Sequence, residues 1–224
     1  MERMTGKVGT IVEAAGMKWI ILDKLPEGYF ALSAESIGNK RFGNNNDWRD
    51  SKLREYLNSE FAEKIEKEIE TALPEFERNL LSLDGQIEYD TCMNKVSLIT
   101  IDEYRKYRQY IPNAGYYWWT CTSDSTKSNG DGYWLAVVSP SGNINNNSYN
   151  NDNGVRPSWI TGSRSRQEAE TSKDTEKRTT FLLEVNTKVY IWTKILFVIL
   201  TTCIKLIKRQ KQVKALVAAL HAFR

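Results

Sequence analysis

The chain has 224 residues, 41% of them hydrophobic and 26% charged, which suffices for one sizeable globular domain with a tail or for two small domains. Its net charge of +3 is unevenly spread, because residues 1–160 carry 18 basic and 23 acidic side chains, whereas residues 161–224 carry 13 and 5. The only histidine, His221, lies near the end, which excludes most serine–histidine, cysteine–histidine and histidine–metal sites from the first part.

The first segment, residues 7–34, is predicted to form three strands, because apolar stretches alternate with turn residues. A polar loop with three successive asparagines follows at residues 44–46. A helix is predicted next, with Asp47 or Asp50 as its N-cap and an end at or before Pro74. Its apolar residues recur every four positions and form one stripe: Leu53, Leu57, Phe61, Ile65 and Ile69.

The middle of the chain predicts two strand pieces, around residues 80–83 and 96–99, with a turn at Asp84-Gly85. A short helix is expected over residues 102–110, and Thr100 is its candidate cap.

Strand-forming sequence dominates from residue 116 to residue 160. Residues 134–138 and 143–145 are predicted to pair as a hairpin across the turn at residues 139–142. The last strand, residues 155–160, is expected to be interrupted or at a sheet edge, because Pro157 lacks an N–H group. Successive strand residues face opposite ways, so one of Trp118 and Trp119 is expected to be buried and the other partly available. Tyr133 and Trp134 are expected to split in the same way.

Composition divides the chain into a domain at residues 1–160, a polar linker at 161–180 and a basic, apolar-rich helical tail at 181–224. The apolar run at residues 189–204 is short for a membrane span, and Lys194 interrupts it. A span through residues 189–207, an interfacial helix, a partner-binding helix and an unrelated appended segment are all open readings. No nucleic acid partner is expected, because the basic cluster lacks a recognition motif. Residues 1–5 lack an apolar stretch, so no secretory signal of the usual form is expected.

Several motifs occur in a fixed order along residues 8–160. They are a W-x-x-S-x-L-R-x-x-L-N pattern from Trp48 to Asn58, then Phe61, Lys95-Val96-Ser97-Leu98-Ile99, Glu103 with Tyr107, Trp118-Trp119, Gly132-Tyr133, and Gly154-Val155-Arg156-Pro157. Together they resemble an uncharacterised bacterial and phage domain family of the C-type-lectin-like fold. Its relatives include the variable proteins of diversity-generating retroelements and, more distantly, the formylglycine-generating enzymes.

The resemblance implies an α+β domain of C-type-lectin-like, or formylglycine-generating-enzyme-like, fold with two helices and antiparallel strands. It also implies that the C-terminal strands and loops present a binding surface. In the variable proteins that surface is diversified by mutagenesis directed to adenines, and asparagine codons are mostly adenine. Seven of the eleven residues from 143 to 153 are asparagine, so an actively diversified surface is one hypothesis for this stretch.

The candidate ligand-binding residues lie in the loop before the hairpin, on the hairpin and after it. They are Trp119, Ser123, Asp124, Ser125, Thr126, Lys127, Asn129, Asp131, Tyr133, Asn143, Asn145, Asn147, Tyr149, Asn150 and Asp152. Asparagine, serine and tyrosine supply adaptable hydrogen bonds and stiff contact area. The alternatives are a polar loop at residues 143–153 and a solvated connector at residues 123–131.

Catalysis and metal binding have little support in the sequence. Cys92, Cys121 and Cys203 are odd in number and fit no metal-binding spacing, so reduced thiols are expected in place of a Cys92–Cys121 disulfide. Oxygen-rich loops can hold calcium, but no sugar–calcium motif of C-type lectins is present, and Asp47 and Asp50 are better explained as caps. No enzyme activity, cofactor or metal is expected. Arg54 and Arg156 are expected to be structural.

The sequence therefore predicts a non-catalytic module that binds a protein or glycan through an Asn-, Tyr- and Ser-rich surface, with retroelement diversification as an open question. The alternative is a structural phage or cell-surface protein whose domain serves assembly contacts. The expected location is cytoplasmic or phage-associated, with membrane attachment by the C-terminal segment as a further alternative.

Overall fold

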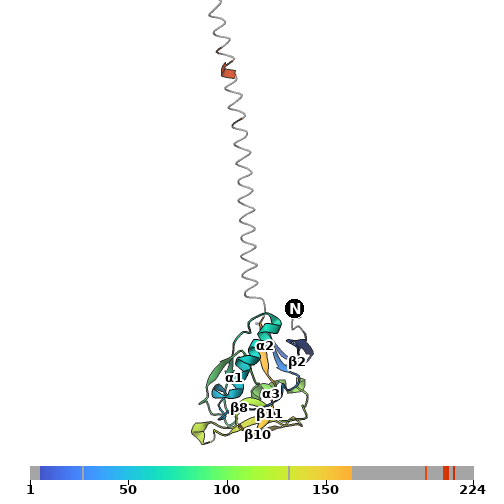
Figure 1. Ribbon diagram of the computed structural model, residues 1–224, viewed down its shortest axis with the longest axis vertical. Helices are drawn as coiled ribbons and strands as arrows, with labels where there is room; N and C mark the ends of the chain where they lie inside the picture. Colours follow the sequence, from blue (N-terminus) through green and yellow to red (C-terminus); the bar gives the residue numbers. More distant parts are fainter. Residues whose placement is uncertain are drawn as a thin grey trace, which may run out of the picture. The chain divides into compact units, whose positions relative to one another are not determined.

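The computed structural model describes residues 6–26, 28–130 and 132–162, together with residues 200, 209–211 and 214 (Figure 1). The chain divides into two units, Met1–Ser163 and Arg164–Arg224. The first unit is a mixed α+β fold built largely from antiparallel strands, which confirms the predicted α+β class.

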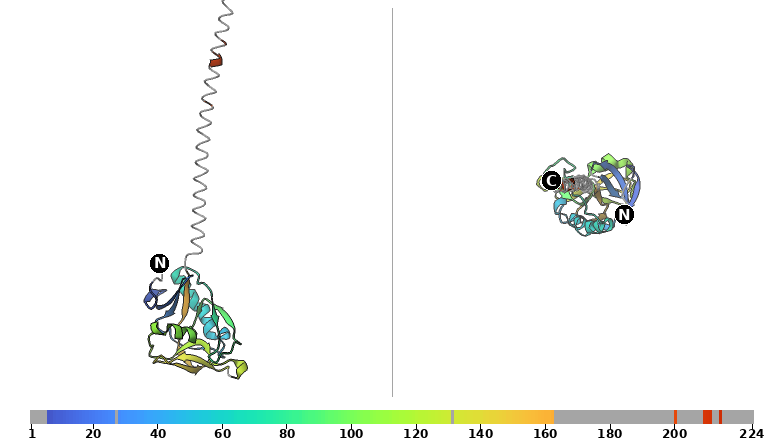
Figure 2. Two further views of the ribbon diagram at one scale, coloured as in Figure 1. Left: turned by 180° about the vertical axis from the view of Figure 1, so that it is seen from behind. Right: turned by 90° about the horizontal axis from the view of Figure 1, so that it is seen from above.

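Two five-stranded sheets and one two-stranded sheet form this unit. The first sheet has the order β1 (Ile11–Ala14), β2 (Met17–Leu25), β3 (Gly28–Ser33), β12 (Ser158–Gly162) and β7 (Val96–Ser97). The second has the order β10 (Ile144–Ser148), β9 (Trp134–Val138), β8 (Trp118–Ser123), β11 (Asp152–Gly154) and β4 (Asn39–Arg41). The small sheet pairs β5 (Phe76–Asn79) with β6 (Thr91–Asn94). In Figures 1 and 2, β8, β10 and β11 lie across one end of the unit, and α2 and β2 lie toward the other.

The helices of the described residues are short. They are η1 (Trp48–Asp50), α1 (Lys52–Asn58), α2 (Glu60–Ile69), α3 (Ile101–Tyr107), η2 (Arg108–Tyr110) and η3 (Lys127–Asn129). The single helix predicted after residue 47 is therefore wrong in detail, because the backbone turns away from helical geometry at Ser59. Both halves keep the same four-residue spacing, so the apolar stripe is buried as predicted at Leu53, Leu57, Phe61 and Ile65.

The predicted caps are partly confirmed. Asp47 caps η1 by accepting the N–H of Arg49, but Ser51 rather than Asp50 caps α1. The helix ends well before Pro74, at Ile69, and its C-cap residue Glu70 has a left-handed backbone with φ 53°. Thr100 caps α3, as predicted, in a reciprocal capping box with Glu103.

The strand predicted at residues 80–83 is wrong, since β5 ends at Asn79 and the chain then leaves the sheet. Leucines 81 and 83 are exposed there, so strand-like composition did not correspond to a paired strand. The turn at Asp84-Gly85 is confirmed, because the Gly85 N–H donates to the carbonyl of Ser82. Residues 80–90 form a loop between β5 and β6.

The C-terminal strands largely follow the prediction. β9 and β10 form the expected hairpin, with Ile144 opposite Val138 and Ser148 opposite Trp134. The last segment is interrupted at Pro157, as expected, and the chain passes from β11 in one sheet to β12 in the other. The second sheet thus contains the hairpin together with β4, from the first part of the domain, and β11, from its last part.

Both faces of β8 are covered, which corrects one prediction. Trp119 packs against Phe42, with ring centroids 5.7 Å apart, in a core cluster that also contains the apolar stripe of α1 and α2. Trp118 packs against Tyr104 of α3, at 5.7 Å, in the second core cluster. Side chains of β8 alternate as a strand requires, but each face meets its own core, so both tryptophans are buried.

Candidate ligand-binding surface

The loop from residue 123 to residue 130 is held in place by Asn46. This asparagine is fully buried, and its Nδ2 donates to the carbonyls of Ser125 at 2.9 Å and Trp134 at 3.0 Å. Its Oδ1 accepts from the hydroxyl of Tyr89 at 2.7 Å, and that hydroxyl accepts the N–H of Lys127 at 3.1 Å. The loop is therefore fixed to two distant segments.

A second set of contacts fixes the same loop to residues 80–90. The N–H groups of Leu83 and Asp84 donate to the carbonyls of Ser123 and Asp124, at 2.8 and 3.2 Å. The amide of Asn129 donates to the carboxylate of Asp84 at 3.0 Å. The two loops thus form one connected structure, and the β5–β6 loop belongs to the candidate surface although the sequence predicted a strand there.

The predicted site residues differ widely in exposure. Buried among them are Trp119, Ser123 and Thr126; half-buried are Asp124, Ser125, Asn147 and Tyr149. Exposed are Lys127, Asn129, Tyr133, Asn143, Asn145, Asn150 and Asp152. Asp131 lies outside the described residues. The prediction that Trp119 is available to a ligand is wrong, because its ring lies in the core and its Nε1 donates to the carbonyl of Lys40.

An aromatic group lies at the start of the hairpin. Tyr133 and Trp134 are 40% and 38% exposed, with ring centroids 5.1 Å apart, and Tyr149 packs on Tyr133 at 5.0 Å. The prediction that one of the pair would be buried is wrong. Tyr133 precedes β9, so the alternation of side chains between the two faces of a strand does not apply to it. The amide of Asn150 donates to the hydroxyl of Tyr133 at 3.4 Å. We name Tyr133, Trp134 and Tyr149 the aromatic group.

The asparagine-rich stretch is ordered by its own side chains. The amide of Asn151 donates to Asn147 at 2.6 Å, and the amide of Asn147 donates to Asn153 at 3.1 Å. The hydroxyl of Ser148 donates to Asn150 at 2.6 Å. Residues 144–148 form a strand, so the alternative of a simple polar loop is wrong for this part of the stretch.

Two asparagines also cover the free edge of β10, which is an edge strand of its sheet. In an antiparallel strand, every second N–H group faces the partner strand. The N–H of Tyr149 donates to the carbonyl of Tyr133 and so faces the partner. The N–H groups of Asn146 and Ser148 therefore face away from β9. Each outward N–H donates instead to the preceding side chain, to Asn145 Oδ1 at 2.8 Å and to Asn147 Oδ1 at 2.9 Å. Native proteins commonly protect such edges with charges. In β10, asparagine side chains instead accept hydrogen bonds from the backbone N–H groups of the free edge.

Replacing Asn145 and Asn147 by valine is expected to cause concentration-dependent self-association. The change frees two edge N–H groups per chain, and a net hydrogen bond contributes about 1 kcal/mol, so the dissociation constant for pairing should fall about tenfold or more. Analytical ultracentrifugation measures this. Asn146→Val is the control, since it adds a valine to the same strand and leaves both caps in place. Equal association of the two variants would contradict the capping role.

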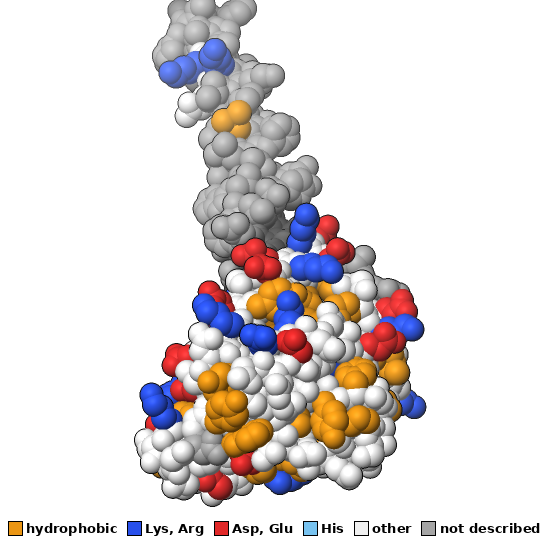
Figure 3. All heavy atoms as spheres, turned by 60° about the horizontal axis from the view of Figure 1, so that its bottom comes forward, with side chains coloured by type: hydrophobic (Ala, Val, Ile, Leu, Met, Phe, Trp, Pro, Cys, Tyr) orange, Lys and Arg blue, Asp and Glu red, His pale blue; other side chains and the backbone are white. Residues whose placement is uncertain are grey.

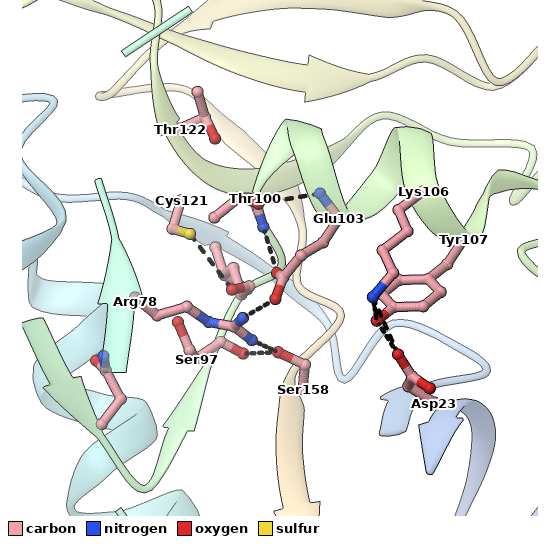
Figure 4. A network of polar contacts seen from close by, with 12 residues as sticks. Asp23, Arg78, Ser97, Thr100, Glu103, Lys106, Tyr107, Cys121, Thr122 and Ser158 are labelled. Carbon is pink, nitrogen blue, oxygen red and sulfur yellow. Dashed lines mark hydrogen bonds and ion pairs between the residues drawn. The ribbon is translucent and has the colours of Figure 1, made fainter. Parts of the chain in front are cut away.

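The buried ionic groups are used to join elements. Arg78 of β5 pairs with Glu103 at the start of α3 and donates to the hydroxyl of Ser158 at 2.8 Å (Figure 4). Its guanidinium lies between the rings of Phe30 and Phe76, 5.0 and 4.6 Å from their centroids. This network connects the small sheet, α3 and the first sheet.

A separate group in Figure 4 fastens α3 to β2. The hydroxyl of Tyr107 donates to Asp23 at 2.6 Å, and Lys106 donates to both of them. The hydrogen bond from Tyr107 lowers the pKa of Asp23, whereas burial raises the pKa of Tyr107, so this tyrosine stays protonated. Asp23 lies where the pairing of β2 with β3 shifts register. The contacts of Asp23 with Lys106 and Tyr107 therefore fasten this irregular part of β2 to α3.

The cysteines and two further arginines lie in the same unit. Cys92 and Cys121 are free thiols, as predicted, and burial raises the pKa of Cys121 to about 12. Arg156 is fully buried, donates twice to the carbonyl of Ser33, and has its pKa lowered to about 10 by burial. Arg54 donates to Asn94 and to the carbonyl of Met93. Both arginines bond to backbone carbonyls, as expected for structural arginines.

Among the described residues, no three His, Cys, Asp or Glu side chains come together as a metal site would need. In the same part of the chain, no helix has the length and apolar character needed to cross a membrane. Apart from Leu200, the segment at residues 189–207 lies outside that part, as do the predicted linker from residue 163 onward and most of the predicted tail.

Comparison with known families gives one similarity. Residues 17–103 are similar to the family described as Domain of unknown function (DUF6273). This region runs from β2 into α3, so it includes Asn46 and the β5–β6 loop but ends before the hairpin. No curated protein and no solved structure matches the chain.

Proposed function

We propose that the domain at residues 1–160 is a non-catalytic module of C-type-lectin-like fold that binds a protein or glycan ligand at the β9–β10 hairpin and the loop at residues 123–130. The observation that supports this most is the aromatic group. Two large aromatic side chains remain about 40% exposed beside a loop that is held by buried hydrogen bonds. Rigid, partly exposed aromatics are typical of binding surfaces, because they bury large area with little loss of conformational freedom.

The asparagines around this group support the same proposal. Asn143, Asn145 and Asn150 are exposed, and an amide group both donates and accepts hydrogen bonds. The non-catalytic character is supported by the buried thiol of Cys121 and by the engagement of Arg78, Glu103, Asp23 and Tyr107 in structural contacts. Diversification by a retroelement is a further part of the proposal, and a near-copy of the gene segment differing at adenines would test it.

The binding proposal is tested by screening the full chain on glycan and protein arrays, alongside the Tyr133→Ala/Trp134→Ala double variant. Each aromatic of a binding centre typically contributes about 2 kcal/mol or more, so the double variant should weaken any captured interaction by about a thousandfold. Tyr117→Ala is the matched control, because Tyr117 is 42% exposed and is not part of the aromatic group. Equal binding by all three chains would refute the site.

A further inference from the structure

The β5–β6 loop presents apolar side chains to solvent. Leu81 is 38% exposed, Leu83 is 36% exposed and Ile87 is 79% exposed, all within seven residues. Burial of leucine and isoleucine is favourable by roughly 25 cal/mol per Å² of apolar surface, so a fold gains nothing from leaving them outside. Exposed apolar surface marks interaction sites in native proteins where it forms a contiguous patch.

This loop is held rigidly, although its apolar side chains are exposed. The hydroxyl of Ser82, which is buried, accepts the N–H of Gln86 at 2.7 Å, and the N–H of Gly85 donates to the Ser82 carbonyl at 3.0 Å. Tyr89, at the end of the loop, is buried and bonded to Asn46. The exposed leucines and isoleucine are therefore presented by a loop with fixed backbone, which lowers the entropic cost of binding.

The loop lies next to the segment that leads to the aromatic group. Leu83 donates its N–H to Ser123, and the next residue, Asp124, donates its N–H to the carbonyl of Trp134. The segment Ser123-Asp124 thus has the apolar loop on one side and the aromatic group on the other. Figure 3 shows that apolar side chains gather in patches on the end of the unit that comes forward, with uncharged surface between them.

The charges on this loop and its neighbour are mainly acidic. Asp84 and Glu88 are exposed, and hydrogen bonds from neighbouring hydroxyl and N–H groups lower the pKa of each carboxyl, so both are ionised at neutral pH. Asp90, at the end of the loop, and Asp124 add two more carboxylates, and Lys127 is the basic side chain in the described part of the 123–130 loop. A ligand for this surface should therefore carry positive charge beside its apolar groups.

We propose that the β5–β6 loop and the aromatic group form one binding surface, and that its ligand is a protein segment with apolar side chains next to lysine or arginine. This inference rests on the proposed function and chooses a protein over a glycan. Leu81, Leu83 and Ile87 offer no hydrogen bond to a sugar hydroxyl, whereas they match the apolar side chains of a protein. The acidic side chains Asp84 and Glu88 then face the basic residues of that partner.

The test is selection of a phage-displayed library of random twelve-residue peptides on the full chain. Selected peptides should combine apolar residues with lysine or arginine, and Leu83→Ser/Ile87→Ser should weaken their binding at least tenfold. Asp84→Asn/Glu88→Gln should weaken it at low salt and reduce its salt dependence. Ile11→Ser is the matched control, because Ile11 is 57% exposed on β1 of the other large sheet. Circular dichroism checks that each variant is folded.

The outcomes separate this inference from the proposed function. Peptides that require Tyr133 and Trp134 but tolerate both loop variants would overturn the inference and leave the binding hairpin in place. Peptides that tolerate the aromatic and loop variants alike would overturn both. A library that yields no specific binder, while the glycan array yields one, would also overturn the choice of a protein ligand.

Discussion

Replacing Arg78 by alanine is expected to lower the free energy of unfolding by about 3–5 kcal/mol, the cost typical of breaking a buried ion pair from one side. The side chain of Arg78 is 4% exposed and that of its partner, Glu103, is 25% exposed. Its loss removes the bond to Ser158 and the contacts with two phenylalanine rings. Urea unfolding followed by tryptophan fluorescence measures the change.

Arg105→Ala is the control for this prediction. Arg105 pairs with Asp102 at 2.9 Å on the surface of α3, where both side chains are more than half exposed. Pairs of that kind contribute about 0.2–1 kcal/mol at most. A loss below about 1 kcal/mol for Arg78→Ala, or equal losses for both variants, would contradict the connecting role given to the buried arginine.

Replacing Asn46 by alanine is expected to destabilise the domain by about 2–3 kcal/mol, because it leaves buried donors and acceptors without partners. The hydroxyl of Tyr89 loses its acceptor, and the carbonyls of Ser125 and Trp134 lose a donor. The loop at residues 123–130 should open more often. Hydrogen exchange at the N–H of Lys127 and Asp124 should therefore be faster by about tenfold or more.

Asn44→Ala is the matched control, since Asn44 is exposed in the same loop. Its replacement is expected to change stability by less than about 0.5 kcal/mol, as is usual for exposed positions. If Asn46→Ala lowered stability but left exchange at residues 123–130 unchanged, Asn46 would be a core residue without the proposed role in holding the loop.

The fold was predictable where the pattern depends on near neighbours. The Thr100 cap, the turn at Asp84-Gly85 and the β9–β10 hairpin each follow from residues within a few positions of one another. The four-residue stripe correctly predicted which face of α1 and α2 is buried. The break between α1 and α2 at Ser59 was not predictable, because the four-residue spacing of the apolar side chains continues across it.

Features that depend on distant partners were not predictable. Alternation along β8 separates Trp118 from Trp119, but only tertiary packing shows that each side meets its own core. Nothing local distinguishes Asn46 from Asn44, because its partners lie more than 40 positions away. For the same reason the apolar run at residues 80–83 predicts a strand, whereas its backbone bonds to Ser123 and leaves Leu81 and Leu83 exposed.

The two edge caps on β10 divide the asparagine-rich stretch into positions with different tolerance to mutation. Asn145 and Asn147 must keep a short side chain with an acceptor oxygen, which restricts them to a few residue types such as aspartate, serine or threonine. Asn143 and Asn146 are exposed and carry no such cap, so many residue types fit there. Any process that mutates this stretch, whether directed or neutral, would therefore produce sequences in which restricted and variable positions alternate along one strand.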